Sequence, residues 1–145
     1  MTAPRTRRWI TTAGFHPGTT AQVNTVIASG PVTVQRVIVQ PTACVDGGST
    51  LRWPWWEWGL QYGAAPASLG LPLVSEAPWL VWRRVFMQNP ATRPICNPSP
   101  PQTVDTEGQR ILPAGQNLYF SCRSKDASQV TDFTWYARVL VLDPV

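Results

Sequence analysis

Few residues in this chain of 145 are of the types that carry out catalysis. His16 is the only histidine, and it lies in a Gly- and Thr-rich stretch rather than at the end of a predicted strand. A hydroxyl or thiol nucleophile needs a base within hydrogen-bond reach, and only His16 could serve. The two closest carboxylates, Asp105 and Glu107, fall at a predicted turn, which is typical of surface charges. We therefore expect no catalytic residues and predict that the protein is not an enzyme.

Metal and phosphate sites are not predicted either. Cys44, Cys96 and Cys122 are widely spaced, and no Cys-x-x-Cys motif accompanies the single histidine, so a zinc ligand set is not expected. The Gly47–Gly48 pair lacks the following Lys and helix of a phosphate loop. An odd number of cysteines and the lack of a predicted secretory signal argue against a disulfide framework. We expect buried thiols and no cofactor.

Tryptophan is unusually frequent, with 8 residues, and four of them cluster between positions 53 and 58. Strand alternation places Trp53 and Trp55 on one face and Trp56 and Trp58 on the other. All four cannot enter one core. The alternatives are a core position, a contact with a neighbouring subunit, or an exposed platform on which a sugar stacks. Trp55, Trp56 and Trp58 are therefore candidate contact residues.

A second candidate surface lies near the start of the chain, where Arg5, Arg7 and Arg8 precede Trp9. Arginines neutralise phosphates and tryptophan can stack on a base, so this segment is compatible with weak contact with a nucleic acid. Three arginines are too few to be specific. The alternative is a terminus that is solvated or that clasps a neighbouring subunit, and the net charge of +4 decides nothing between these.

Arg83 and Arg84 stand side by side in another predicted strand. Adjacent strand residues face opposite ways. We expect one of the two to pair with an acid across a sheet or subunit boundary.

The elements that must position these residues are strands. The 15 prolines and 10 glycines leave little room for a long helix, and no apolar run is long enough to span a membrane. Turn signals separate short β-branched and aromatic runs, which predicts an all-β, antiparallel β-sandwich over residues 31–145. Residues 1–30 are predicted to form an extended N-terminal arm. The predicted strands cover residues 32–39, 51–62, 79–88, 103–105, 109–112, 118–123 and 133–142.

Local signals refine this arrangement. Pro54 places the 51–62 strand at a sheet edge or a bulge. Residues 113–115 and 124–132 resemble hairpin turns, and residues 89–103, with five prolines, are predicted to be a loop without regular structure. The last strand is apolar on both faces, which indicates a central strand or an edge that is covered in an assembly.

From Trp79 onward the order of features resembles small jelly-roll structural proteins of virions, from bacteriophages and other viruses. A Trp-rich strand is followed by an Asp-x-x-x-x-Arg-x-Leu stretch, an apolar strand and a terminal Arg-Val-Leu strand. The segments that carry the resemblance are 79–82, 104–112, 116–120 and 133–141. They cover the last 65 or so residues of the chain. The Trp-rich 51–62 strand has no place in this pattern.

This resemblance implies a jelly-roll sandwich and a protein that works by assembly in many copies in the virion, as a shell, decoration, or head or tail component. Its partners would be copies of itself and other virion proteins, with weak genome contact through the arm and no membrane insertion. The residues expected to make contacts are Arg5, Arg7, Arg8, Trp9, Trp55, Trp56, Trp58, Arg83 and Arg84. The alternative is a glycan-binding β-sandwich module that uses exposed tryptophans.

Overall fold

The structure is a computed structural model that describes residues 5–16, 22–46, 55–68, 79–86, 95–96, 104–124 and 131–144. Within these residues the chain forms nine β-strands and no helix, so none of these segments is a helix able to span a membrane. The strands are β1 (Arg7–His16), β2 (Val23–Ser29), β3 (Val32–Asp46), β4 (Trp55–Gly63), β5 (Trp79–Phe86), β6 (Ile95–Cys96), β7 (Val104–Leu112), β8 (Asn117–Ser124) and β9 (Thr131–Leu142).

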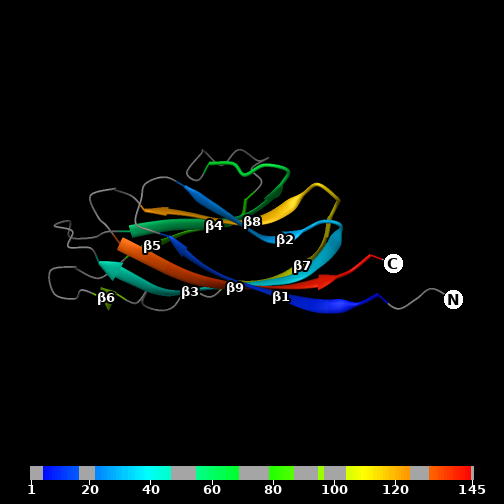
Figure 1. Ribbon diagram of the computed structural model, residues 1–145, viewed down its shortest axis with the longest axis horizontal. Helices are drawn as coiled ribbons and strands as arrows, with labels where there is room; N and C mark the ends of the chain where they lie inside the picture. The colour runs from blue at the N-terminus through cyan, green and yellow to red at the C-terminus, as the bar shows by residue number, and fades with distance from the viewer. Residues whose placement is uncertain are drawn as a thin grey trace.

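The strands form two antiparallel sheets that pack face to face (Figure 1). Sheet A has the order β1-β9-β3, with β7 and β6 pairing along successive parts of the other side of β3. Sheet B has the order β2-β8-β4-β5. The predicted all-β, antiparallel β-sandwich is confirmed.

The pairings are nested along the chain. β4 pairs with β5, β3 with β7, β2 with β8, and β1 with β9. Each of these pairs encloses the preceding one in the sequence. Two further pairings, β3 with β9 and β4 with β8, join these pairs into the two sheets. Strands that are distant in sequence are therefore neighbours throughout the sandwich.

Two segments of the predicted N-terminal arm are strands of the sandwich, so the prediction is wrong for residues 7–16 and 23–29. β1 pairs with β9 at ten consecutive positions, and β2 pairs with β8. The glycine content that suggested an unpaired segment has a packing reason. A Cβ atom on Gly14 would overlap the indole ring of Trp135, so glycine lets β1 lie close to that side chain.

The connections differ from the predicted hairpins. β7 belongs to sheet A and β8 to sheet B, so the turn at residues 113–116 crosses between the sheets instead of joining paired strands. β8 and β9 are likewise in different sheets. A turn signal marks a reversal of the chain, but whether its two strands pair is decided by tertiary packing.

The boundaries of several strands also differ from the predicted ones. β4 is central, between β8 and β5, and begins at Trp55, after Pro54. β3 continues past Pro41, where its register with β9 shifts by one residue and the missing N–H is accommodated. β7 is one strand, and β6 is a two-residue strand inside the predicted 89–103 loop.

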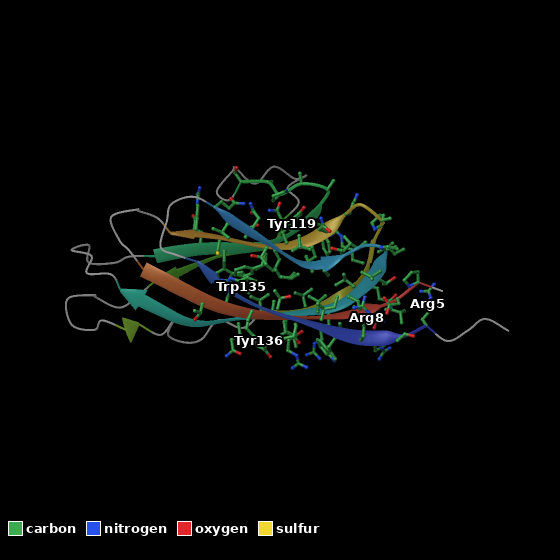
Figure 2. All side chains as sticks on the ribbon, in the orientation of Figure 1. Arg5, Arg8, Tyr119, Trp135 and Tyr136 are labelled. Atoms are coloured by element: carbon green, nitrogen blue, oxygen red, sulfur yellow. The ribbon has the colours of Figure 1, made fainter. Side chains whose placement is uncertain are left out.

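The core lies between the sheets and is centred on three aromatic rings. Phe120 of β8 stacks on Trp135 of β9 with ring centroids 4.0 Å apart, and on Trp58 of β4 at 5.5 Å. Trp135 belongs to sheet A and the other two to sheet B, so the stack joins the sheets. Figure 2 shows Trp135 in the layer between them. Valines of β3 and β9 and leucines of β4 and β8 surround the rings.

We expect Phe120→Ala to lower the free energy of unfolding by about 3–5 kcal/mol, because it empties the centre of this stack. Ile111→Ala is the matched control, since its side chain is 76% exposed, and should change stability by no more than about 0.5 kcal/mol. Urea denaturation of both variants measures this. Equal losses would contradict the central place of Phe120.

Candidate functional site

One face of sheet A carries apolar, aromatic and basic side chains outside the core. Along β9, Trp135, Ala137, Val139 and Val141 are buried, so the alternate residues lie on the opposite face. Figure 2 shows Tyr136 on that opposite side of the sheet. Cross-strand register extends this face to β1, β3 and β7. We call it the outer face of sheet A: Arg7, Trp9, Thr11, Arg36, Ile38, Ile111, Tyr136, Arg138 and Leu140.

Trp9 and Arg138 form the centre of this face. The Trp9 side chain is 41% exposed, and the guanidinium carbon of Arg138 lies 4.6 Å from the centroid of its ring. Leu140 stands directly opposite Trp9 in the ladder. The cation–π contact, worth about 0.5–1 kcal/mol at an exposed site, holds the indole against the sheet. The result is an ordered aromatic and cationic surface.

A shallow hollow of about 320 Å³ opens beside Trp9, lined by Arg7, Gln35, Arg36, Gly108, Gln109 and Leu140. It coincides with a break in the ladder between β3 and β7, whose register shifts between Val34 and Arg36. Gly108 has a φ of 134°, which L side chains rarely adopt. The bulge thus requires glycine at position 108, and the sheet carries no side chain there.

Two ion pairs lie in sheet A, one on the outer face and one in phase with the opposite face at the end of β1. Arg8 Nε and Nη2 donate to the Asp143 carboxylate at 2.8 and 3.1 Å, and Arg36 makes a two-point contact with Asp105, with Nε 2.7 Å from Oδ1. These hydrogen bonds lower the pKa of both carboxyl groups below the ordinary value. The first pair fastens the start of β1 to the segment after β9. Arg8 is thereby committed to a structural contact.

The other predicted site residue near the start of the chain, Arg5, lies at the end of the sandwich. It lines a second hollow, of about 380 Å³, with Pro31, Ile111, Pro113 and Pro144. Arg5 is exposed, as are Arg7 and Trp9. The structure therefore brings Arg7 and Trp9 together on the outer face of sheet A, with Arg5 beyond its end.

Of the tryptophans predicted on β4, the structure describes the side chain of Trp58. Trp58 is fully buried in the aromatic stack. It therefore belongs to the core and is not a contact residue. Trp56 is in phase with Trp58 along β4, and Trp55 is in phase with Glu57. The side chains of Trp55 and Trp56 lie outside the described residues.

Sheet B holds a buried carboxylate, Glu57 of β4, with an arginine position opposite it on each of the two neighbouring strands. Glu57 is 1% exposed and accepts a hydrogen bond from Arg123 Nε at 2.8 Å. Arg84 stands opposite Glu57 on the other side, in the ladder of β4 with β5. The register thus places an acid beside Arg84 within the same sheet, whereas the predicted ion pair across a sheet or subunit boundary stays a prediction. The side chains of both arginines lie outside the described residues.

The outer side of sheet B differs from that of sheet A because the segment after β4 returns over it. The Gln61 side chain exchanges two hydrogen bonds with the backbone of Ala67, and the Tyr119 hydroxyl donates to the Ala64 carbonyl. Ser121 and Gln61 are fully buried there. This arrangement closes part of the sheet B surface, whereas no segment that the structure describes returns over the outer face of sheet A.

The three cysteines lie on three different strands, β3, β6 and β8. Among the described residues no group of three His, Cys, Asp or Glu side chains could hold an ion. Cys122 is a buried free thiol, as predicted, and burial raises its pKa to about 12. Cys44 and Cys96 stand opposite one another in the ladder of β3 with β6.

Sequence reasoning missed Arg36, Arg138 and Leu140 as site residues. Arg138 and Leu140 had a signal in the alternation of β9, since both lie out of phase with its buried valines. Arg36 had a weaker one, because it is out of phase with Val37 and Val39 but in phase with Val34. What the sequence lacked was the register that brings them beside Trp9.

We expect Asp143→Asn to lower the melting temperature at neutral pH. The depressed pKa of Asp143 means that the pair stabilises the fold above the ordinary value of 3.8. That contribution is lost as the pH falls below this value and through the lower pKa of the folded state. Melting curves of both proteins between pH 7 and acid measure this. A difference that does not shrink in acid would contradict the assignment.

We expect Glu57→Gln to lower the free energy of unfolding by about 3 kcal/mol, because the buried partner of Arg123 loses its charge. Asp105→Asn is the matched control, since it breaks an exposed pair and should cost no more than about 1 kcal/mol. Urea titrations of the two variants at neutral pH decide. A larger loss for the exposed pair would refute this ranking.

Comparison with protein-family models found no match for this chain, and comparison with curated protein sequences found none with significant similarity.

Proposed function

We propose that the sandwich is a jelly roll. In that fold eight strands wrap into two packed sheets as two Greek keys. The nested pairs support this: β1–β9, β2–β8, β3–β7 and β4–β5. They arrange the chain as one long hairpin, in which strands from the first half pair with strands from the second half. The β3–β9 and β4–β8 pairings then fold this hairpin over, so that its strands form two sheets. The short β6 is an addition to β3 within this plan.

We propose further that the protein is a virion structural protein, a shell, decoration, or head or tail component, that acts by multi-copy self-assembly. The observation that carries the proposal is the outer face of sheet A. It presents Trp9, Tyr136, Leu140 and Ile111 together with arginines, and aromatic residues and arginine are enriched at protein interfaces. The partners would be copies of the chain and other virion proteins.

The edge of sheet A beside this face supports the same function. β1 ends the sheet, and its ten positions pair with β9 without a register shift. By contrast, the ladders of the edge strands β2, β5 and β7 each contain one. Bulges protect edges against further pairing, so β1 is the edge suited to another strand.

A second copy fits this edge in the antiparallel direction. Pairing about Thr11 places Arg7 of one copy opposite Phe15 of the other, so the Arg7–Arg8 pairs of the two copies lie at opposite ends. Such a contact is a two-fold, self-complementary one. We propose this edge contact in place of an extended arm that clasps a neighbouring subunit, because residues 7–16 are already paired within their own sheet.

The first test is the solution mass by light scattering of the full chain and of two variants. We expect the wild type to form a defined oligomer or particle, and Trp9→Ala to shift it towards the monomer mass of 16.1 kDa. Val26→Ala is the matched control, because Val26 is 44% exposed on sheet B. It should leave the assembly unchanged. A wild type that is monomeric at all concentrations would overturn the assembly proposal.

The glycan-binding alternative loses Trp58, which is buried, and gains Trp9 as an exposed tryptophan in addition to Trp55 and Trp56, whose side chains lie outside the described residues. Trp9 is exposed beside a hollow that contains Arg7, so a monomer that binds glycans through Trp9 is the outcome that would favour it. Genome contact is the lesser alternative. Of the three arginines expected to make it, Arg8 is paired with Asp143, which weakens that alternative. Salt-sensitive binding of DNA would support it.

A further inference from the structure

We infer that Cys44 and Cys96 are the two halves of a disulfide that fastens β6 to the far end of β3. The two residues are direct partners in the antiparallel ladder of β3 with β6. The inference rests on this juxtaposition and is independent of the proposed function.

Direct partners in an antiparallel ladder have Cα atoms about 4.5 or 5.5 Å apart. A disulfide needs a Cα separation of roughly 4.4–6.8 Å, so either kind of ladder position lies within reach. Partners in a ladder also belong to the same face of the sheet. No movement of the backbone is then needed to bring the two positions within bonding range.

The bond also explains why β6 exists. β6 is only two residues long, and it interrupts a stretch from 89 to 103 that contains five prolines. Its ladder with β3 has just two positions, which supply few hydrogen bonds against the entropy of ordering the chain. A covalent link across a long loop offsets that entropy by restricting the unfolded chain.

Cys122 accounts for the odd number of cysteines. It is buried in β8, on the side of sheet B that faces the core, and is a free thiol. Its partners in the ladders are Val23 of β2 and Trp58 of β4. Cys122 therefore serves as a matched control within the same chain.

The reaction requires a two-electron oxidant, for which we name glutathione disulfide. One cysteine thiolate attacks a sulfur of the oxidant and forms a mixed disulfide with release of one glutathione thiol. The second cysteine thiolate then displaces the other glutathione. The products are the protein disulfide and two molecules of reduced glutathione, with the two thiol protons accounted for by the two new glutathione thiols.

The test equilibrates the folded full chain with glutathione disulfide and measures intact mass and a non-reducing tryptic digest. We expect a mass lower by about 2 Da and a linked peptide pair, residues 37–52 with residues 85–110. Cys44→Ser and Cys96→Ser should each abolish the link, and Cys122→Ala should retain it. Alkylation of both Cys44 and Cys96 in the oxidised protein, or a link to Cys122, would overturn the inference.

Stability gives a second readout that does not depend on the digest. Reduction of the wild type should lower its melting temperature by roughly 5–10 °C. The same reductant should leave the melting temperature of Cys44→Ser unchanged. An equal effect of the reductant on both proteins, or a disulfide that joins two chains on a non-reducing gel, would contradict an intramolecular bond.

Discussion

The contact between Phe120 and Trp135 joins the two sheets, and most of the sandwich is arranged around it. Phe120 lies on β8, which pairs with β2 and β4, and Trp135 lies on β9, which pairs with β1 and β3. One strand from the interior of each sheet thus meets the other at this aromatic stack. Gly14 is part of the same constraint, because any side chain there would displace the Trp135 ring.

This arrangement leaves the two outer faces with different chemistry. The return of residues 64–68 over sheet B turns Gln61, Ser121 and Tyr119 into a hydrogen-bonded layer. Sheet A receives no such cover from the described residues, and its outer side chains include apolar, aromatic and cationic ones. Arg36 pairs with Asp105 at the rim, whereas Arg138 lies over Trp9 at the centre. The sheet that carries β1 and β9 is therefore the one on which we propose that a partner binds.

The sequence allowed the sandwich to be predicted, because turn signals separate short β-branched and aromatic runs and the prolines leave little room for a long helix. The two apolar faces of the last strand left a central position or a covered edge open, and the structure places β9 centrally, between β1 and β3. Strand pairing was not predictable, because the same turn residues serve a hairpin and a crossing between sheets, as residues 113–116 illustrate. β1 was missed because Gly14, which makes room for the Trp135 indole, resembles in sequence a glycine in an arm. β2 was assigned to the same arm.

The site was predicted in part for the same reason. Arg7 and Trp9 were identified from their types, but Arg138 and Leu140 join them only through the register of β1 with β9. Trp58 could have entered either the core or a contact, and the choice depended on which face of β4 met Phe120. Local pattern thus gave the chemistry of single residues, and long-range pairing decided which of them act together.

The nesting of strand pairs has a consequence for synthesis on the ribosome. β1 is made first, but its partner β9 begins only at Thr131. β2 must likewise wait for β8, and only β4 with β5 can pair soon after emergence. Native pairing therefore proceeds from the middle of the chain outward, and the slow closure of distant strands comes last. The free edge of β1 exists as an ordered strand only after β9 is in place, so folding of each chain precedes any contact made through that edge.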